Sequence, residues 1–528
     1  MAPRGSRRRS RGRAVPKTAR DAVDALLQEE LGRRGFRPAL ENEARRAAEV
    51  AARRSLPRRD LVEMPTFTVD PATAHDFDDA VSARREGDGA RLWIHIADVA
   101  AHVPPGSPLD EEARLRGNST YVPGTVEPML PHVLSSGACS LAPGVERLAV
   151  TVEVELSGDG RPLSASIYRS RIRSDARLDY DEIDAIFAGR SGAPEPVAEP
   201  LEVARSAARA LGEGRGTTSL DVESSEPEFR FDAGGDVVGA RSVPQTESHR
   251  LIERLMILAN EQVARLLEQK RVPTIYRVHG QPDPPRVERL IAQLHDLRIP
   301  TPPLQPGISP REAGEIAAEA SRLVRREAAR RGHGREAYTS LVLRSLKQAH
   351  YSERNSGHAG LGSAAYCHFT SPIRRYPDLV VHRALLAALG EGEEAPRAAE
   401  AREVSWHCSE REREATRIER DADDVCAAFL LERELSEGDR ERRFSGEVSG
   451  LIRSGAFVAF GGELGDVYEG FLPARRLRAE DFLELNETET ALVGRDSGRR
   501  VQLGDPISVQ VTGVAAPRGR VDLNPAES

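Results

Sequence analysis

The sequence predicts an α+β protein, in which a large body of mixed strands and helices precedes a small β-barrel. Between about residue 60 and residue 437, alternating apolar runs typical of strands are mixed with runs at helical spacing. After residue 443 only short β-rich runs occur. The length of 528 residues exceeds that of one ordinary domain, and a composition of 39% hydrophobic and 30% charged residues is typical of a globular chain.

Residues 1–17 form a basic segment that we expect to be a disordered arm. They contain six arginines, one lysine and no acidic residue, a charge of +7. Because the whole chain carries −8, the remainder must carry −15. Such an acidic body argues against broad, nonspecific coating of nucleic acid, but it leaves room for a focused basic channel. The arm could contact RNA or be a solvated tail, and the sequence leaves both readings open.

Residues 18–60 predict a short helical segment that is interrupted near Gly32, Gly35 and Pro38. The main body then extends over residues 61–438. Its clearest strands are predicted at 92–99 and 148–156, with a short helix at 108–117 between them. Residues 190–218 are loose around one helix. Further helices are predicted at 246–270, 309–350 and 376–390, and residues 397–437 predict one long charged helix.

Residues 443–524 predict a separate barrel domain. Five short β-rich runs, separated by glycine turns, begin near residues 446, 455, 467, 507 and 519. Five strands at this spacing favour a small closed barrel of the OB type.

The cysteines and the hydropathy of the sequence indicate where in the cell the protein is expected. No run of about 18 apolar residues is present, and the basic N-terminus lacks the apolar stretch of a secretory signal. The four cysteines are far apart and form no C-x-x-C pair, which argues against a disulfide framework or a zinc finger. We therefore expect a cytoplasmic protein without a membrane partner.

The strongest chemical signal is a cluster of four carboxylates, Asp70, Asp76, Asp78 and Asp79, within ten residues. Like charges this close raise one another's pKa unless a cation neutralises them, and hard oxygen ligands select Mg²⁺ or Mn²⁺. Two such ions can serve phosphoryl transfer. From spacing alone, a solvated acidic turn is an equally good reading. A calcium loop is a weaker one, because the EF-hand spacing is absent.

The segment around these aspartates, TFTVDPATAHDFDDAVS, closely resembles the active-site signature of the ribonuclease II / ribonuclease R family, in its RNB catalytic domain. Further blocks resemble the family in the same order, among them IHIADVAAHVPPGSPLDEEARLRGNSTYVPG, TESHRLIERLMILANE, YRVHGQPDP and HFTSPIRRYPDLVVHR. The resemblance covers about residues 60–435 and implies a core of sheet and helices around an RNA channel. The C-terminal barrel resembles the S1-type RNA-binding domain.

The resemblance implies a set of site residues. The four aspartates would organise Mg²⁺, or Mn²⁺, and the scissile phosphate, with Asp78 the carboxylate most directly needed and Asp79 beside it. Arg374, within Ser-Pro-Ile-Arg, would contact the phosphate near the cut, where a planar guanidinium can stabilise developing charge. Arg375 would support it. Tyr121 would stack on the 3′-terminal bases.

Two glutamates also match family positions near the RNA, Glu419 in RIERD and Glu253 in HRLIERL. A solvated helix face is the competing reading for Glu419, and helix packing is the competing reading for Glu253. Four histidines near these motifs are not spaced as a metal triad, and we interpret them as structural or channel-lining: His75, His95, His249 and His279.

The chain departs from the family pattern in three places. About 60 residues precede the signature, too few for the tandem cold-shock barrels common in relatives, so we expect these to be missing. Val222 aligns where relatives often carry a stacking Phe, which would weaken the clamp opposite Tyr121. In the barrel, Pro473 and Ala474 replace the usual polar residues. Two barrel aromatics could stack on RNA or fill the barrel core, namely Phe444 and Phe457.

Together these features predict a Mg²⁺-dependent hydrolytic exoribonuclease. It would degrade single-stranded RNA processively from the 3′ end to nucleoside 5′-monophosphates, as a monomer, in RNA turnover or 3′-end processing. Two alternatives stay open. One is an RNA-binding protein that holds transcripts without cutting them. The other is an enzyme of the same chemistry that only trims particular 3′ ends.

Overall fold

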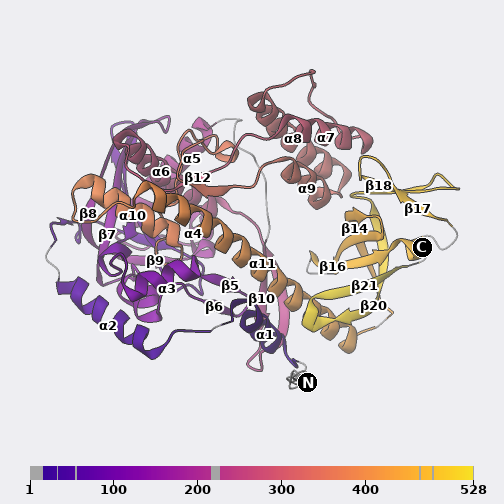
Figure 1. The fold of residues 1–528 in the computed structure, drawn as a ribbon, viewed down its shortest axis with the longest axis horizontal. Coiled ribbons are helices and arrows are strands. Elements are labelled where there is room, and N and C mark those ends of the chain that lie inside the picture. The colour runs from indigo at the N-terminus through magenta and orange to yellow at the C-terminus, as the bar shows by residue number, and fades with distance from the viewer. Residues whose placement is uncertain are drawn as a thin grey trace, which may run out of the picture.

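The computed structural model describes residues 16–32, 34–53, 56–215, 226–439, 441–462, 465–477 and 481–526. Most of the basic arm and Val222 lie outside the described residues, so the expectations for them stay predictions. The predicted α+β class is confirmed: a mixed core of sheet and helices is followed by a closed β-barrel (Figure 1).

The N-terminal segment forms two helices, α1 (Ala19–Leu31) and α2 (Pro38–Arg53). Helix α1 begins at Thr18, whose side chain accepts the Asp21 N–H, and ends at Gly32 with φ 63°, a left-handed conformation that suits glycine. The two helices bury their apolar faces in different places. Leu27 of α1 packs into the cluster shared by the long helix α11 (Ala398–Glu437) and the barrel, whereas Ala44 of α2 packs into the main core.

The core is built on a seven-stranded sheet with strand order β1-β8-β7-β4-β3-β2-β9. Neighbouring strands are antiparallel, except that β1 pairs in parallel with β8, and β2 with β9. Alternate residues of the central strands point to a fully buried face, for example Leu92, Ile94 and Ile96. The strand bounds are β1 (Arg59–Asp60), β2 (Phe67–Val69), β3 (Asp79–Glu86), β4 (Gly89–Ala97), β7 (Glu146–Leu156), β8 (Pro162–Arg173) and β9 (Ala176–Leu178).

Helices α5 (Ala198–Gly214) and α6 (Glu247–Lys270) pack against this sheet. The predicted helix over 246–270 is therefore confirmed, and α5 is the one helix expected within the loose stretch. Three further helices follow in this region, α3 (Pro108–Arg116), α4 (Tyr180–Phe187) and α10 (Tyr376–Leu389), together with the turns η1 (Val99–Ala101), η2 (Val133–Ala138) and η4 (Ala359–Leu361). Strands outside the main sheet form two-stranded pairs: β5 (Thr120–Val122) with β6 (Thr125–Glu127), β10 (Glu226–Phe231) with β11 (Val237–Val243), and β12 (Tyr276–Val278) with β13 (His350–Ser352).

The predicted long charged helix is α11 (Ala398–Glu437), an unbroken helix of 40 residues. At 1.5 Å per residue it is about 60 Å long. It begins beside β13, passes β5, and ends against the barrel, so it joins the two parts of the molecule (Figure 1).

The stretch 309–350, predicted to be helical, contains two helices, α8 (Pro310–Arg331) and α9 (Arg335–Ser345). Gly332 and Gly334 between them have φ of 75° and 81°, which breaks the helix. With α7 (Pro284–Asp296) they form a three-helix unit. This unit packs against barrel residues Val448 and Ala456.

The C-terminal region forms the predicted OB-type barrel, closed in the order β14-β15-β16-β21-β20. Phe444 is 2% exposed and contacts Phe460, so it belongs to the barrel core, whereas Phe457 is half-buried beside Phe471. A three-stranded sheet that the sequence did not predict is inserted before β20. The bounds are β14 (Arg443–Ile452), β15 (Gly455–Gly462), β16 (Gly465–Pro473), α12 (Ala474–Leu477), β17 (Leu483–Leu485), β18 (Ala491–Gly494), β19 (Arg500–Gln502), β20 (Pro506–Ala515), η5 (Ala516–Arg518) and β21 (Arg520–Pro525).

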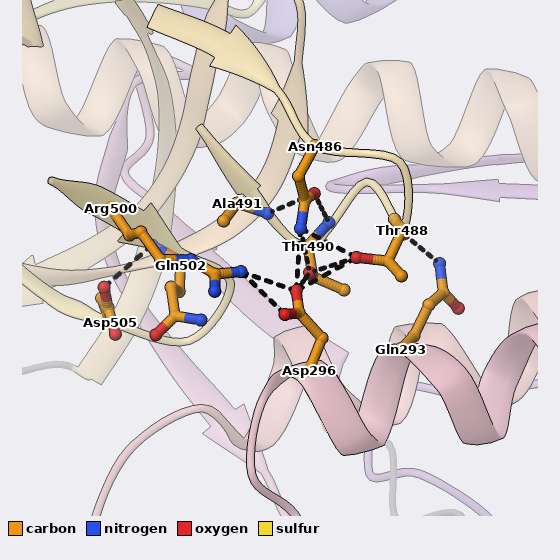
Figure 2. A network of polar contacts seen from close by, with 9 residues as sticks. All are labelled: Gln293, Asp296, Asn486, Thr488, Thr490, Ala491, Arg500, Gln502 and Asp505. Atoms are coloured by element: carbon orange, nitrogen blue, oxygen red, sulfur yellow. Dashed lines mark hydrogen bonds and ion pairs between the residues drawn. The ribbon is translucent and has the colours of Figure 1, made fainter. Parts of the chain in front are cut away.

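Asp296, at the end of α7, ties the three-helix unit to the inserted sheet (Figure 2). Its carboxylate accepts hydrogen bonds from the hydroxyls of Thr488 and Thr490, and both oxygens accept from Arg500, at 2.9 and 2.7 Å. Asn486 also donates to it at 2.8 Å. Because every donor comes from the β17–β19 region, this one carboxylate fixes two separate parts of the chain together.

In the described part of the chain, no helix is both long enough and apolar enough to cross a membrane. All four cysteines are buried and unpaired.

Candidate active site

The acidic segment is the loop between β2 and β3, at one end of the sheet. Asp70 directly follows β2, and its N–H donates to the carbonyl of Leu178 in β9. Asp79 is the first residue of β3, which runs antiparallel to β2. The Arg177 guanidinium donates to the carbonyls of Pro71 and Ala72 at 3.0 and 2.7 Å, which fixes the start of the loop. The two aspartates therefore lie at the same end of adjacent strands.

A cavity of about 680 Å³ opens beside this loop. It gathers residues from the acidic loop, from β5, from α4, from α6 and from the segment before α10. Seven of the residues that the sequence singled out line it: Asp70, Asp76, Asp79, Tyr121, Glu253, Arg374 and Arg375. The volume falls within the range of about 300–1,000 Å³ typical of small-molecule sites.

Asp78 lies behind the wall of this cavity rather than on its surface. It is 2% exposed. One of its carboxylate oxygens accepts the Ile373 N–H at 2.8 Å, and the other accepts Arg374 Nε at 3.2 Å. Arg374 also donates to Ser371 Oγ at 3.1 Å. Asp78 therefore holds the turn that carries Arg374 and orients its guanidinium toward the cavity.

A second buried carboxylate, Asp378, supports the same turn. It accepts the Ser371 N–H and the Arg375 guanidinium, both at 2.8 Å, from the first turn of α10. Asp378 carries only a weak signal in the sequence, an acid in the first turn of a helix. Four polar residues that line the cavity, Tyr180, Asn260, Tyr366 and Thr370, were not predicted from the sequence.

The acidic loop is electrostatically strained. Burial, and then repulsion from Asp79, raises the pKa of Asp70 far above its ordinary value, although Arg374 partly opposes this. Burial also raises the pKa of Asp79 and of Asp78, again against Arg374. One Asp70 oxygen, Oδ2, is buried without any hydrogen-bond partner. Such groups need a positive charge to stay ionised.

These features bear on the metal that the resemblance implies. Among the described residues, no three His, Cys, Asp or Glu side chains are already grouped as a complete metal site. The donors that face the cavity are nevertheless hard carboxylate oxygens, one of them without a partner. Hard oxygen ligands, with water and a substrate phosphate completing the shell, are the pattern of Mg²⁺ and Mn²⁺. The residues present therefore fit such an ion.

Tyr121 joins the acidic loop to the long helix. Its hydroxyl donates to Asp76 Oδ2 at 2.8 Å, and its backbone N–H donates to Glu419 Oε1 at 2.9 Å. Its side chain is 38% exposed at the cavity. Glu419, on α11, thus contacts the site through the backbone of Tyr121, while Glu253 reaches the cavity directly from α6.

Of the four histidines interpreted from the sequence, three make structural contacts. His95 is buried between the hydroxyls of Ser82 and Thr151, and burial lowers its pKa to about 3. His249 binds Thr246 at the start of α6, and His279 bonds the Lys347 carbonyl. The fourth, His75, is exposed on the acidic loop.

Comparison with known proteins agrees with this geometry. The RNB domain family matches residues 58–391, and the S1 RNA binding domain family matches residues 439–524. Ribonuclease R of Escherichia coli is 34% identical over 485 residues, which cover 88% of this chain and 57% of that protein. Ribonuclease R of Thermotoga maritima is 35% identical over 480 residues, covering 88% and 64%. The chain thus spans somewhat more than half the length of these relatives.

The fold also resembles that of a solved ribonuclease R structure. The structure of Mycoplasma genitalium RNase R in complex with ribose methylated single-stranded RNA superposes with a TM-score of 0.85 and 25% identity, over 97% of this chain and 78% of that one. With its RNB core, its S1-type barrel and its ribonuclease R relatives, the chain belongs to the RNB domain family.

Proposed function

We propose that this protein is a hydrolytic exoribonuclease that degrades single-stranded RNA from the 3′ end to nucleoside 5′-monophosphates. The proposal includes Mg²⁺ dependence with Mn²⁺ as a possible substitute, processive action, a monomeric state and a role in RNA turnover or 3′-end processing. The four unpaired cysteines favour a reducing cytoplasm. The S1 match and the RNA-bound relative support RNA as the substrate.

One observation carries the proposal. A single cavity holds carboxylates with raised pKa values on one wall and the Arg374 guanidinium on another. Acidic groups alone would repel a phosphodiester, and a cation alone would bind it without cutting it. Their combination suits hydrolysis of a phosphate ester, in which positive charge must neutralise the phosphate oxygens while water is activated.

In this proposal Asp70 and Asp79 hold the divalent ion, with Asp76 at the cavity edge. When bound, the ion would activate water for attack and neutralise the scissile phosphate. Its charge would also permit Asp70 and Asp79 to be ionised together, which burial otherwise opposes.

The cationic wall has two parts with different roles. Arg374 faces the cavity and would donate to the phosphate oxygens as negative charge develops on them. Asp78 accepts from Arg374 and from the backbone beside it, so it acts as a positioning residue in this structure. Arg375, bonded to Asp378, supports the same turn.

Tyr121 would bind the terminal base. Its ring is exposed at the cavity, and stacking on an aromatic ring is insensitive to base identity. The hydrogen bonds to Asp76 and Glu419 hold this ring beside the carboxylates. A 3′-terminal base stacked there would bring its phosphate toward the metal-binding wall.

The proposal is tested with 5′-labelled oligo(A) and with uniformly labelled RNA in the presence of Mg²⁺. We expect progressive shortening from the 3′ end and release of nucleoside 5′-monophosphates. Asp79→Asn and Asp78→Asn should abolish shortening but retain RNA binding. Asp88→Asn is the matched control, because Asp88 is an exposed carboxylate at the far end of the same strand pair. Binding by the wild type without shortening would instead favour an RNA-binding protein.

A further inference from the structure

A second groove, separate from the candidate active site, lies between β13 and α11. It has a volume of about 460 Å³. Its lining contains two arginines, an exposed histidine, a glutamine and a tryptophan, and none of these belongs to the acidic cavity. The full set is Gln348, His350, Tyr351, Ser352, Glu353, Arg402, Ser405, Trp406, Ser409 and Arg413.

Trp406 is the most unusual of these residues. It lies on α11 with 63% of its surface exposed, whereas the only other tryptophan of the chain, Trp93, is 6% exposed. A large aromatic side chain left in water is unfavourable relative to a buried one unless a ligand or partner covers it. The helix around it offers a flat floor, because Ser405 and Ser409 turn their hydroxyls back to backbone carbonyls of the same helix.

Positive charge lies on the same helix face. Arg402, Trp406, Ser409 and Arg413 follow one another at spacings of three or four residues, so they share one side of α11. Arg402 is paired with Glu353 at 3.0 Å. Arg413 is exposed, and no hydrogen bond or ion pair to it is found among the described residues. The groove therefore combines an uncovered ring with one uncompensated guanidinium.

We propose that this groove binds one nucleotide, with its base on Trp406 and its phosphate on Arg413. An aromatic ring binds the face of any base, a guanidinium binds phosphate, and Gln348 and His350 offer polar groups for a base edge or ribose. The volume suits a single nucleotide rather than a strand. The ligand could be a free nucleoside 5′-monophosphate or one nucleotide of an RNA chain, which share this chemistry.

A chain of side-chain contacts joins the groove to the candidate active site. Tyr351, which lines the groove, donates to or accepts from His368 Nδ1 at 2.8 Å, and His368 packs edge-on against Tyr366, which lines the acidic cavity. His368 thus contacts one residue of each site. Nucleotide binding in the groove does not require the hydrolysis proposed above, so each can fail without the other.

The test uses the two tryptophans as internal reporters. Trp93→Phe leaves Trp406 as the only fluorophore of this type, and Trp406→Phe leaves only Trp93. Each protein is titrated in EDTA with 5′-AMP, adenosine, inorganic phosphate or a short oligo(A). We expect saturable quenching by 5′-AMP in Trp93→Phe and none in Trp406→Phe. Arg413→Ala, in the Trp93→Phe background, should weaken 5′-AMP binding about tenfold and leave adenosine unchanged.

A Trp406→Ala variant, measured by equilibrium dialysis, should bind 5′-AMP about 5- to 150-fold more weakly at this site, as expected for the loss of one stacked base. Saturable quenching by oligo(A) alone would support the site and assign it to a nucleotide of an RNA chain. The proposal is overturned if neither 5′-AMP nor oligo(A) quenches Trp406. It is also overturned if adenosine and 5′-AMP bind equally and Arg413→Ala changes neither.

Discussion

Replacing Asp70 with asparagine should stabilise the cation-free protein and at the same time abolish the proposed hydrolysis. Asp70 is one of the carboxylates that crowd the cavity, and its Oδ2 is buried without a partner. Burial, and then repulsion from Asp79, raises its pKa from 3.8 to about 8. An amide of the same shape removes the charge that the fold opposes.

The size of the effect follows from the pKa difference between the folded and unfolded chain. The folded protein keeps the Asp70 proton up to about pH 8, whereas the unfolded chain loses it near pH 4. This carboxyl therefore lowers stability progressively as the pH rises through that window. At about 1.4 kcal/mol per pKa unit, the stabilisation of Asp70→Asn should grow by about 3–4 kcal/mol between pH 5 and pH 8.

The assay is thermal or urea unfolding of wild type and Asp70→Asn in EDTA at pH 5, 6.5 and 8. Asp88→Asn is the control, because that exposed carboxylate lies on the same strand pair. Adding Mg²⁺ at pH 8 should stabilise the wild type and leave Asp70→Asn nearly unchanged, since the ion binds only the ionised site.

An Asp70→Asn variant that is less stable than the wild type in EDTA at pH 8 would contradict this prediction. A stability difference between the two proteins that does not change with pH would contradict it as well. Either result would mean that the acidic loop is not strained by its own charge.

Two further predictions concern the hydrogen bonds of individual side chains. Arg374→Lys keeps the positive charge but loses the guanidinium that donates to Asp78 and Ser371. The single-turnover rate of shortening should therefore fall about 100- to 1,000-fold, whereas RNA binding should fall far less. A lysine variant as fast as the wild type would contradict the role of Asp78 in positioning Arg374. Burial tends to raise the pKa of Asp296, but hydrogen bonding from Arg500 and Thr490 outweighs this and lowers the pKa to about 2. The ionised Asp296 therefore stabilises the fold above about pH 4, and this contribution is lost as the pH falls toward 2. Asp296→Asn should therefore cost about 2 kcal/mol at pH 7, seen as faster hydrogen exchange in α7–α9 but not in the seven-stranded sheet; equal exchange in both proteins would show that the network adds nothing.

Local sequence patterns predicted most elements of the fold. Helix α6 and the barrel strands show clear periodicity, because each buries one face against a neighbour, whereas α11 was predicted from its long run of charged, helix-compatible residues. The sequence did not predict the β17–β19 sheet, whose strands of three or four residues are too short to show a period. It predicted helix over residues 309–350 without locating the break at Gly332 and Gly334 that separates α8 from α9.

For the site, the sequence shows which chemical groups are present: four carboxylates within ten residues, an arginine after Ser-Pro-Ile and a tyrosine before Val-Pro-Gly. The role of each group follows only from the folded arrangement. Asp78 and Asp79 are adjacent in the chain, yet Asp79 lines the cavity while Asp78 lies behind its wall and bonds Arg374, 296 residues away. The contact of Glu419 with the Tyr121 backbone spans 298 residues. Such partners carry no local signal, because packing of distant elements brings them together.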